Sequence, residues 1–215
     1  LCNRVQKKDR EQCILSINQI FENMHIARYL DYIQDIDLFI KNEVGFIEEF
    51  DFRGSEMYYN SLQFKQKIMH KVVSEHSKVR QFNHDHNPNL DKLHFCETGF
   101  KIGHSSLFWL LYDNRINVVS FDIDTSEFLV DTSEFTLAAR KFLEMHFPNR
   151  FHLILGDTTF TLPKFIHEES AVQCDLWLVD GGNSYSVKVS DLSHAILNSN
   201  HYLINNKDTY IIIEN

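Results

Sequence analysis

The chain has 215 residues, of which 43% are hydrophobic and 13% aromatic, and its formal net charge is −9 at pH 7. This composition predicts a packed globular domain and excludes an intrinsically disordered chain. The acidic balance disfavours nucleic acid as a partner, because binding its backbone requires clustered Lys and Arg. No apolar run approaches the ~18 residues of a membrane-spanning helix. With no membrane span and no visible signal sequence, we expect a cytoplasmic protein.

Four cysteines occur, and no two of them form a CxxC pair. Cys96 and Cys174 lie inside apolar, strand-like runs, where a thiol behaves as a small hydrophobic group. We therefore expect reduced, buried thiols and no disulfide framework.

The first ninety residues have a helical pattern. Apolar residues recur at intervals of three and four over residues 14–39, which predicts one or two amphipathic helices. A further helix is expected from Ser55, since serine can cap a first turn. Residues 81–91 are polar and turn-rich. They mark the expected boundary between a helical cap region, residues 1–90, and a second domain, residues 91–215.

From Lys92 the pattern changes to strands that alternate with helices. The expected strands cover residues 92–99, 117–122, 151–155, 175–179 and 209–213, and the expected helices cover residues 105–112, 134–146, 163–169 and 187–198. The third of these helices is expected to begin at Pro163, because proline suits a first helical position. Alternating strands and helices predict right-handed βαβ units and a Rossmann-like, doubly wound parallel sheet.

A glycine-containing turn, ETGFKIGHS over residues 97–105, follows the first expected strand. Glycine lets the backbone turn sharply and approach a ligand, and the helix start that follows offers free N–H groups. The glycine spacing differs from the G-x-G-x-x-G of dinucleotide pyrophosphate loops, so it favours a cofactor that contains adenosine but no pyrophosphate. The alternative is an ordinary strand-to-helix turn that happens to contain glycines.

Acidic residues follow the later strands. Asp122 comes about 20 residues after Gly103, the offset expected for a carboxylate that accepts ribose hydroxyls. Asp124 is the alternative, and its two-residue spacing would place it on the same face. Asp157 and Asp180 follow the third and fourth strands. The carboxyl ends of parallel strands are where open α/β sheets bind ligands, so these acids outline one expected site.

These motifs resemble those of class I S-adenosylmethionine-dependent methyltransferases, in the branch that includes small-molecule O-methyltransferases. The resemblance covers residues 92–215, and ETGFKIGHS matches the family motif E-x-G-x-x-x-G-x-S. It implies S-adenosyl-L-methionine as cofactor, with the methionine part at the glycine turn, the ribose at Asp122 and the adenine near Asp157. The residues implied in cofactor binding are Glu97, Gly99, Phe100, Gly103, His104, Ser105, Asp122, Asp157 and Asp180.

The candidate catalytic positions are Asp180 and Asn183, in the segment DGGNSY. In the uncharacterised methyltransferase-domain proteins that this segment resembles, we expect D-G-x-H-S-Y, with histidine where this chain has Asn183. A neutral imidazole can take a proton from a hydroxyl near pH 7, and an amide cannot. Either the base lies elsewhere, or the substrate needs none, or catalysis is weak or absent.

A metal set is also implied by the resemblance. Metal-dependent O-methyltransferases use an Asp after the fourth strand and an acid–Asn pair after the fifth, which are Asp180, Glu214 and Asn215 here. Three oxygen ligands with open positions suit Mg²⁺. The alternative is that Asp180 only faces the cofactor and that Glu214 and Asn215 form an ordinary strand exit.

The sequence therefore predicts a methyltransferase that acts on a hydroxyl of a small-molecule substrate. The N-terminal helices would cap the site, or form the surface of a homodimer. The alternative is a weak or inactive methyltransferase-like binding module, which Asn183 favours. A nicotinamide dehydrogenase is a third candidate, and the glycine spacing argues against it. Because the resembled fold continues past the fifth strand, the chain is expected to be truncated at its C-terminus.

Overall fold

The computed structural model describes residues 7–44, 68, 70–73, 92–123, 133–168, 172–182, 184–200 and 209–213. In the first helix, side chains are described from Met24 on, except Ile26. In chain order the elements are α1 (Lys7–Val44), β1 (Leu93–Thr98), α3 (His104–Tyr112), β2 (Ile116–Asp122), α4 (Ser133–His146), β3 (Phe151–Leu155), α5 (Thr158–His167), β4 (Leu176–Val179), α6 (Tyr185–Asn200) and β5 (Tyr210–Ile213).

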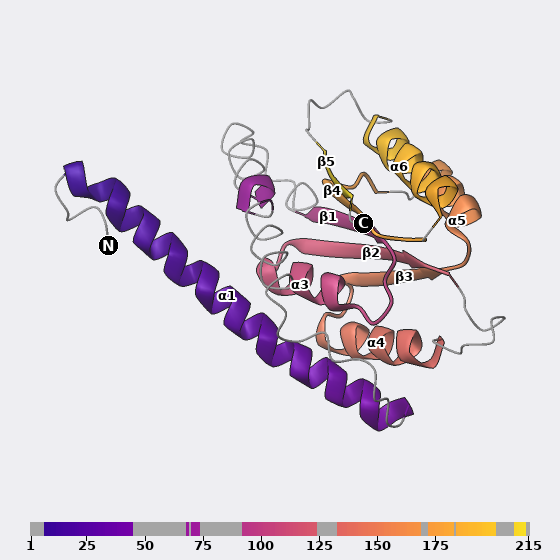
Figure 1. Cartoon of the computed structure of the whole chain (residues 1–215), viewed down its shortest axis with the longest axis horizontal. Helices are drawn as coiled ribbons and strands as arrows, with labels where there is room; N and C mark the ends of the chain where they lie inside the picture. Colours follow the sequence, from indigo (N-terminus) through magenta and orange to yellow (C-terminus); the bar gives the residue numbers. More distant parts are fainter. Residues whose placement is uncertain are drawn as a thin grey trace.

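The five strands form one parallel sheet in the order β3-β2-β1-β4-β5. The chain builds outward from β1 to β3, then crosses back to place β4 on the other side of β1 (Figure 1). This confirms the predicted Rossmann-like, doubly wound sheet. The strand order reverses between β1 and β4, and such a switch point opens a crevice at the carboxyl ends of the two strands.

Helices cover both faces of the sheet. α1, α3 and α4 lie on one face, and α5 and α6 lie on the other (Figure 1). Successive residues of a strand point to opposite faces, so Phe95 of β1 joins the core under α3 while Cys96 joins the core under α5 and α6. The same alternation directs Glu97 toward α3 and Thr98 toward α6, which positions both residues for the site described below.

α1 is one continuous helix of 38 residues, and its N-terminal half extends past the α/β body (Figure 1). Tyr29, Ile33, Ile36 and Ile40 recur at intervals of four, three and four, and all four are buried. This apolar stripe packs on α3 and α4, as expected for an amphipathic helix. The described part of α1 therefore shares a core with the sheet.

His25 of α1 makes the packing of α1 on α3 sensitive to pH. Its ring lies edge-on to Phe108 and Tyr112, with centroid distances of 4.9 Å to each. Burial lowers the pKa of His25 from 6.5 to about 4. Because protonation favours the unfolded chain, this contribution to stability is complete above pH 6.5 and is lost as the pH falls toward 4.

We expect His25→Leu to remove a pH-dependent loss of about 2 kcal/mol in the free energy of unfolding between pH 6.5 and pH 4. The check is urea denaturation of both proteins at several pH values, with the variant-minus-wild-type difference plotted against pH. A difference that stays flat across this range would contradict the assignment.

α5 begins earlier than the sequence suggested. Its N-cap is Asp157, whose side chain accepts a hydrogen bond from Thr159 N, and Pro163 lies inside the helix. The expectation that Pro163 opens this helix was wrong. The aspartate cap fixes the start, and the proline is tolerated although it removes one internal hydrogen bond.

Cys96 and Cys174 form a disulfide, with their Cα atoms 5.8 Å apart. Both residues are fully buried. The chain enters β4 beside β1, where Asp175 N donates to His94 O at 2.7 Å, and this brings together two cysteines that are 78 residues apart. The expectation of reduced thiols was therefore wrong for this pair. The side chains of Cys2 and Cys13 lie outside the described residues.

Candidate cofactor site

The turn between β1 and α3 has a backbone that requires glycine. Gly99 has φ 89° and Gly103 has φ 76°, both in the left-handed region. A Cβ atom on Gly99 would lie 2.5 Å from the carbonyl oxygen of Asp180. Gly99 N also donates to Phe121 O at 2.8 Å. The chain thus leaves β1 between the ends of β2 and β4, at the switch point of the strand order.

Asp122 closes this turn from the end of β2. Lys101 N donates to Asp122 Oδ2 at 2.5 Å, and Ile123 N donates to Oδ1 at 2.8 Å. Burial raises the pKa of Asp122, and the hydrogen bonds from the backbone of Lys101 and Ile123 oppose that rise. The carboxylate is therefore fixed beside the glycine turn. Asp124, the alternative for this role, lies outside the described residues.

The N-terminus of α3 opens from the same turn. Gly103 is its N-cap and provides no side-chain hydrogen bond, and the first turn of α3 contains no acidic residue. The first N–H groups of a helix have no partner within it and favour an anion. Ser105 is half-buried in this first turn. The arrangement suits a carboxylate such as that of an amino acid.

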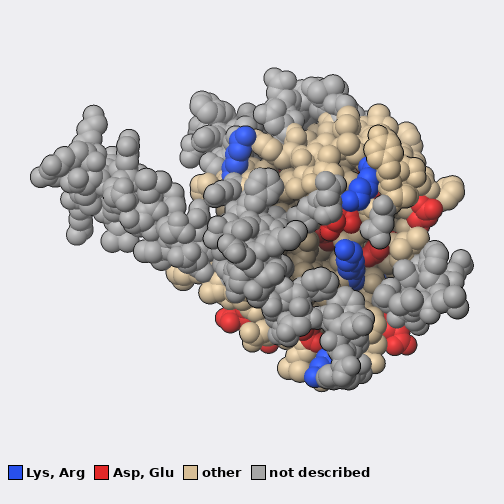
Figure 2. Space-filling model, in the orientation of Figure 1, with Lys and Arg blue, Asp and Glu red and all other residues tan. Residues whose placement is uncertain are grey.

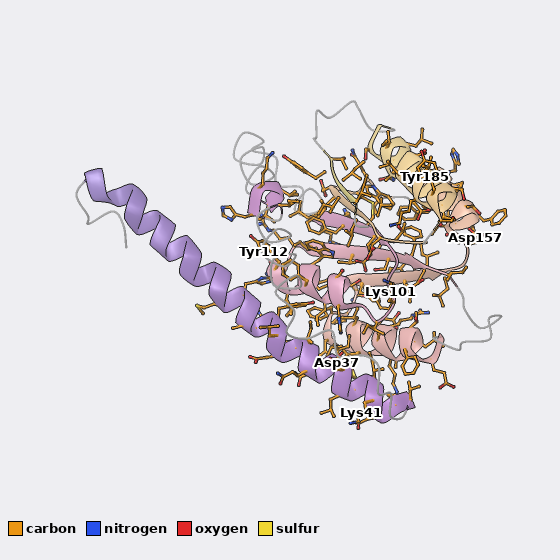
Figure 3. The ribbon with its side chains drawn as sticks, in the orientation of Figure 1. Asp37, Lys41, Lys101, Tyr112, Asp157 and Tyr185 are labelled. Atoms are coloured by element: carbon orange, nitrogen blue, oxygen red, sulfur yellow. A yellow bond between two sulfur atoms is a disulfide. The ribbon has the colours of Figure 1, made fainter. Side chains whose placement is uncertain are left out.

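His104 faces α1. Its Nε2 atom lies 2.9 Å from Asp37 Oδ1, and Tyr29 OH donates to its backbone carbonyl at 3.2 Å. Figure 3 shows Asp37 on α1 and Lys101 in the turn. The first residue of α3 is thus tied to α1 by its imidazole and its carbonyl.

Phe100 and Glu97 are buried beneath the turn. The Phe100 ring lies in the core, 5.4 Å from the ring of Phe151, so its backbone forms the wall of the turn. Glu97 Oε1 accepts hydrogen bonds from Ser120 Oγ, at 2.8 Å, and from Ser106 Oγ. The Glu97 carboxylate thereby connects β1, β2 and α3 directly under the turn.

The ends of β3 and β4 lie at the same edge of the sheet as the glycine turn, the edge formed by the carboxyl ends of the strands. Gly156 N donates to Asp122 O at 2.8 Å, which brings the exposed Asp157 next to the end of β2. The Asp157 carboxylate accepts from Thr159 Oγ1 at 2.7 Å and Thr159 N at 2.8 Å, and these bonds hold its pKa below the usual range. Asp180 N donates to Thr98 O at 3.1 Å.

The predicted catalytic and metal sets are only partly described. Asn183, Glu214 and Asn215 lie outside the described residues. Within the part of the chain that the structure describes, no three His, Cys, Asp or Glu residues are grouped so as to hold a metal ion. The predicted roles of Asn183 and of the Asp180–Glu214–Asn215 set stay predictions.

No family model and no curated protein matches the chain. Similar solved structures include three methyltransferases. A Staphylococcus aureus protein described provisionally as a caffeoyl-CoA O-methyltransferase has 16% identity and a TM-score of 0.39, with 66% of each chain covered. The SAH-bound Podospora anserina methyltransferase PaMTH1 has 18% identity and a TM-score of 0.37, with 68% of each chain covered.

The third similar structure is CalS11, a TDP-rhamnose 3'-O-methyltransferase of calicheamicin biosynthesis. It has 21% identity and a TM-score of 0.39, with 75% of this chain and 70% of that chain covered. This chain spans about two thirds of the length of the first of these structures.

Sequence reasoning missed four residues that hold the site together, namely Ser106, Ser120, Asp37 and Thr98. A signal existed for the two serines, because a glutamate inside an apolar strand requires hydrogen-bond donors nearby. The pairing of Asp37 with His104 left no such signal, since it joins residues 67 apart in the chain.

The described surface gives two further observations. On the face shown in Figure 2, the described Lys and Arg residues are scattered and form no continuous basic patch. No described helix combines the length and the apolar character that crossing a membrane requires.

Proposed function

We propose that the chain is an S-adenosyl-L-methionine-dependent methyltransferase that acts on a hydroxyl group of a small molecule. The observation that carries this proposal is the Gly99–Gly103 turn, which is joined to the Asp122 carboxylate and followed by the uncapped N-terminus of α3. An acceptor for ribose hydroxyls and donors for an amino-acid carboxylate therefore flank a turn that has no side chain at Gly99 or Gly103.

The residues present fit this cofactor. The α3 N-terminus and Ser105 would hold its carboxylate, Asp122 its ribose, and Asp157, which follows β3, would lie near its adenine. The backbone carbonyl of Asp180 lies against Gly99, so the Asp180 carboxylate, at the same strand exit, would accept a hydrogen bond from the ammonium group of the methionine part. When bound, the cofactor supplies an electrophilic methyl group on a sulfonium.

The protein then contributes mainly alignment. In-line displacement requires that the acceptor oxygen be held on the axis of the breaking bond, and fixed turns do this by removing motional freedom beforehand. The Gly99 and Asp180 backbones are in close contact, so the exits of β1 and β4 pack directly against each other. These packed exits would orient both the methyl donor and the acceptor bound over β4.

The proton of the acceptor hydroxyl is the open step. The amide of Asn183 cannot take this proton. Either another group of the protein acts as the base, or the substrate hydroxyl needs no base. A Mg²⁺ ion held by Asp180, Glu214 and Asn215 would lower the pKa of the hydroxyl and is part of the proposal, as is a homodimer formed through the helical region. The second candidate function is a non-catalytic cofactor-binding module, which the asparagine at 183 favours.

Titration calorimetry with S-adenosylmethionine, its demethylated product and NAD tests the proposed function. We expect both adenosyl sulfur compounds to bind and NAD not to bind. Binding of neither would sink the proposal. Tight binding with no turnover on any hydroxyl acceptor, with and without Mg²⁺, would favour the non-catalytic module.

Asp122→Ala is expected to weaken binding of both adenosyl compounds by about 1–3 kcal/mol, because it removes a hydrogen-bond acceptor at the ribose. The matched control is Glu144→Gln, which neutralises an exposed acid of α4 paired with Arg140 and should leave the affinity unchanged. An unchanged affinity in Asp122→Ala would show that the ribose role is misassigned, even if the cofactor itself binds.

A further inference from the structure

Asp191 of α6 is a buried carboxylate that the site described above does not use. Its exposed fraction is 0%, and neither Oδ1 nor Oδ2 makes a hydrogen bond of good geometry among the described residues. The Thr158 and Thr98 hydroxyls are the polar groups near enough to interact with it. Buried carboxylates are normally paired, because an isolated charge is costly to remove from water. An unpartnered carboxylate inside the protein therefore points to a neutral acid at this position.

Asp191 lies beneath the exit of β4. A Cβ atom on Gly181 would lie 3.0 Å from Asp191 Oδ2 and 2.9 Å from Thr98 Oγ1. Gly181 N donates to Thr98 Oγ1 at 3.1 Å, and Thr98 is itself fully buried. These three residues form one packed unit directly under the turn of residues 180–182. The turn can come this close to Asp191 because Gly181 has no side chain.

The groups around Asp191 compensate a negative charge only in part. Burial raises its pKa, and the Thr158 and Thr98 hydroxyls and His194 of α6 oppose that rise. Asp157, at the start of α5, raises the pKa further. No described Lys or Arg pairs with Asp191. A protonated Asp191 can donate to the lone pair of Thr98 Oγ1 that Gly181 N–H leaves free.

We propose that Asp191 is a positioning residue of the cofactor site, which supports the turn of residues 180–182 from beneath as a neutral carboxylic acid acting through Thr98 and Gly181. The inference rests on the proposed function where it concerns cofactor affinity. Ionisation of Asp191 places an uncompensated charge under Gly181 and displaces the turn that carries Asp180. A pH above the folded pKa of Asp191 therefore weakens the site without any change in the groups that touch the cofactor.

The first test is the effect of Asp191→Asn on stability as a function of pH. The pKa in the folded protein is above the unfolded value of 3.8, so the wild type loses stability as the pH rises from 3.8 toward the folded pKa. The asparagine variant, which is nearly isosteric and always neutral, does not. The difference in Tm between the variant and the wild type is expected to be about 3 °C or more larger at pH 8 than at pH 4, in favour of the variant.

The opposite trend overturns the inference. If Asp191→Asn loses stability relative to the wild type as the pH rises, the carboxylate is ionised and accepts stabilising hydrogen bonds. The matched control is Asp175→Asn, which alters a buried acid before β4 that accepts a hydrogen bond from His94 N at 2.9 Å. This control should keep the wild-type loss of stability with pH. The stability arm requires no ligand, so it decides the inference even if no adenosyl compound binds.

The second test is calorimetry with S-adenosylhomocysteine at one pH below and one pH above the loss of stability that the first test locates in the wild type. The wild type is expected to bind about tenfold more weakly at the higher pH, while Asp191→Asn keeps one affinity at both. A role limited to core packing would leave the two proteins with the same pH dependence, and that result would overturn the positioning role. Absence of binding by the wild type at either pH would instead count against the proposed cofactor.

Discussion

Opening the Cys96–Cys174 disulfide is expected to lower the free energy of unfolding by about 4 kcal/mol. The bond joins residues 78 apart in the chain, and a cross-link of that span removes much of the conformational freedom of the unfolded state. It also connects β1 to the entry of β4, the pair of strands whose exits form the candidate site. The expected result is therefore a large shift of the urea midpoint in the presence of a thiol reductant, measured after unfolding and refolding.

The control for this experiment is the double variant Cys96→Ala with Cys174→Ala. It has no bond to open, so its midpoint should be the same with and without reductant. A direct check is maleimide labelling in denaturant without reductant, which should leave Cys96 and Cys174 unmodified. Labelling of both residues under these conditions would show that the thiols are reduced, and the stability effect would then be absent.

The fold could be predicted because its signals are local. β4 reads as an unbroken apolar run, and all four of its residues are buried. Such a strand requires cover on both faces, which points to a parallel sheet. The glycine turn and Asp122 could be found for a related reason, because their spacing follows from one strand, one turn and one helix in succession.

The interactions that hold the site could not be predicted, because they join distant parts of the chain. Within its own strand, Cys96 is indistinguishable from a small apolar residue. Its pairing with Cys174 follows only from the entry of β4 beside β1. Asp191 lies within the helix expected over residues 187–198, ten residues after Gly181, yet it packs against Thr98, which is 93 residues earlier. Whether the Asp191 carboxylate is buried depends on which strands lie beside α6. Its raised pKa could therefore be inferred only once the strand order was known.

The start of α5 shows a different kind of failure. Two local signals competed there, an aspartate followed by threonines at 157–159 and a proline at 163. The proline predicts a start at residue 163, but the aspartate cap sets it at Thr158. An N-cap satisfies N–H groups that would otherwise lack partners, whereas a proline further along removes a single bond.

Replacing Gly99 with alanine is expected to destabilise the fold by about 3 kcal/mol and to abolish cofactor binding. Two effects add at this position. An L-residue at φ 89° is strained, and its Cβ atom would lie 2.5 Å from Asp180 O and 2.8 Å from Asp180 C. Both contacts are with backbone, so neither can be relieved by a side-chain rotation. The exits of β1 and β4 must separate, and the turn that holds Asp122 must move with them.

Gly182→Ala separates the backbone clash from the conformational strain. Gly182 also has a left-handed φ, 52°, but the atoms its Cβ would meet, Cγ1 at 2.5 Å and Cβ at 3.0 Å, belong to the Val187 side chain and not to the backbone of a neighbouring strand. We expect this control to lower the free energy of unfolding by about 1 kcal/mol. Urea denaturation and calorimetry with S-adenosylhomocysteine on both variants decide the point. Equal losses in the two variants would mean that the close approach of Asp180 to Gly99 contributes nothing beyond strain, and that the β1 and β4 exits tolerate separation.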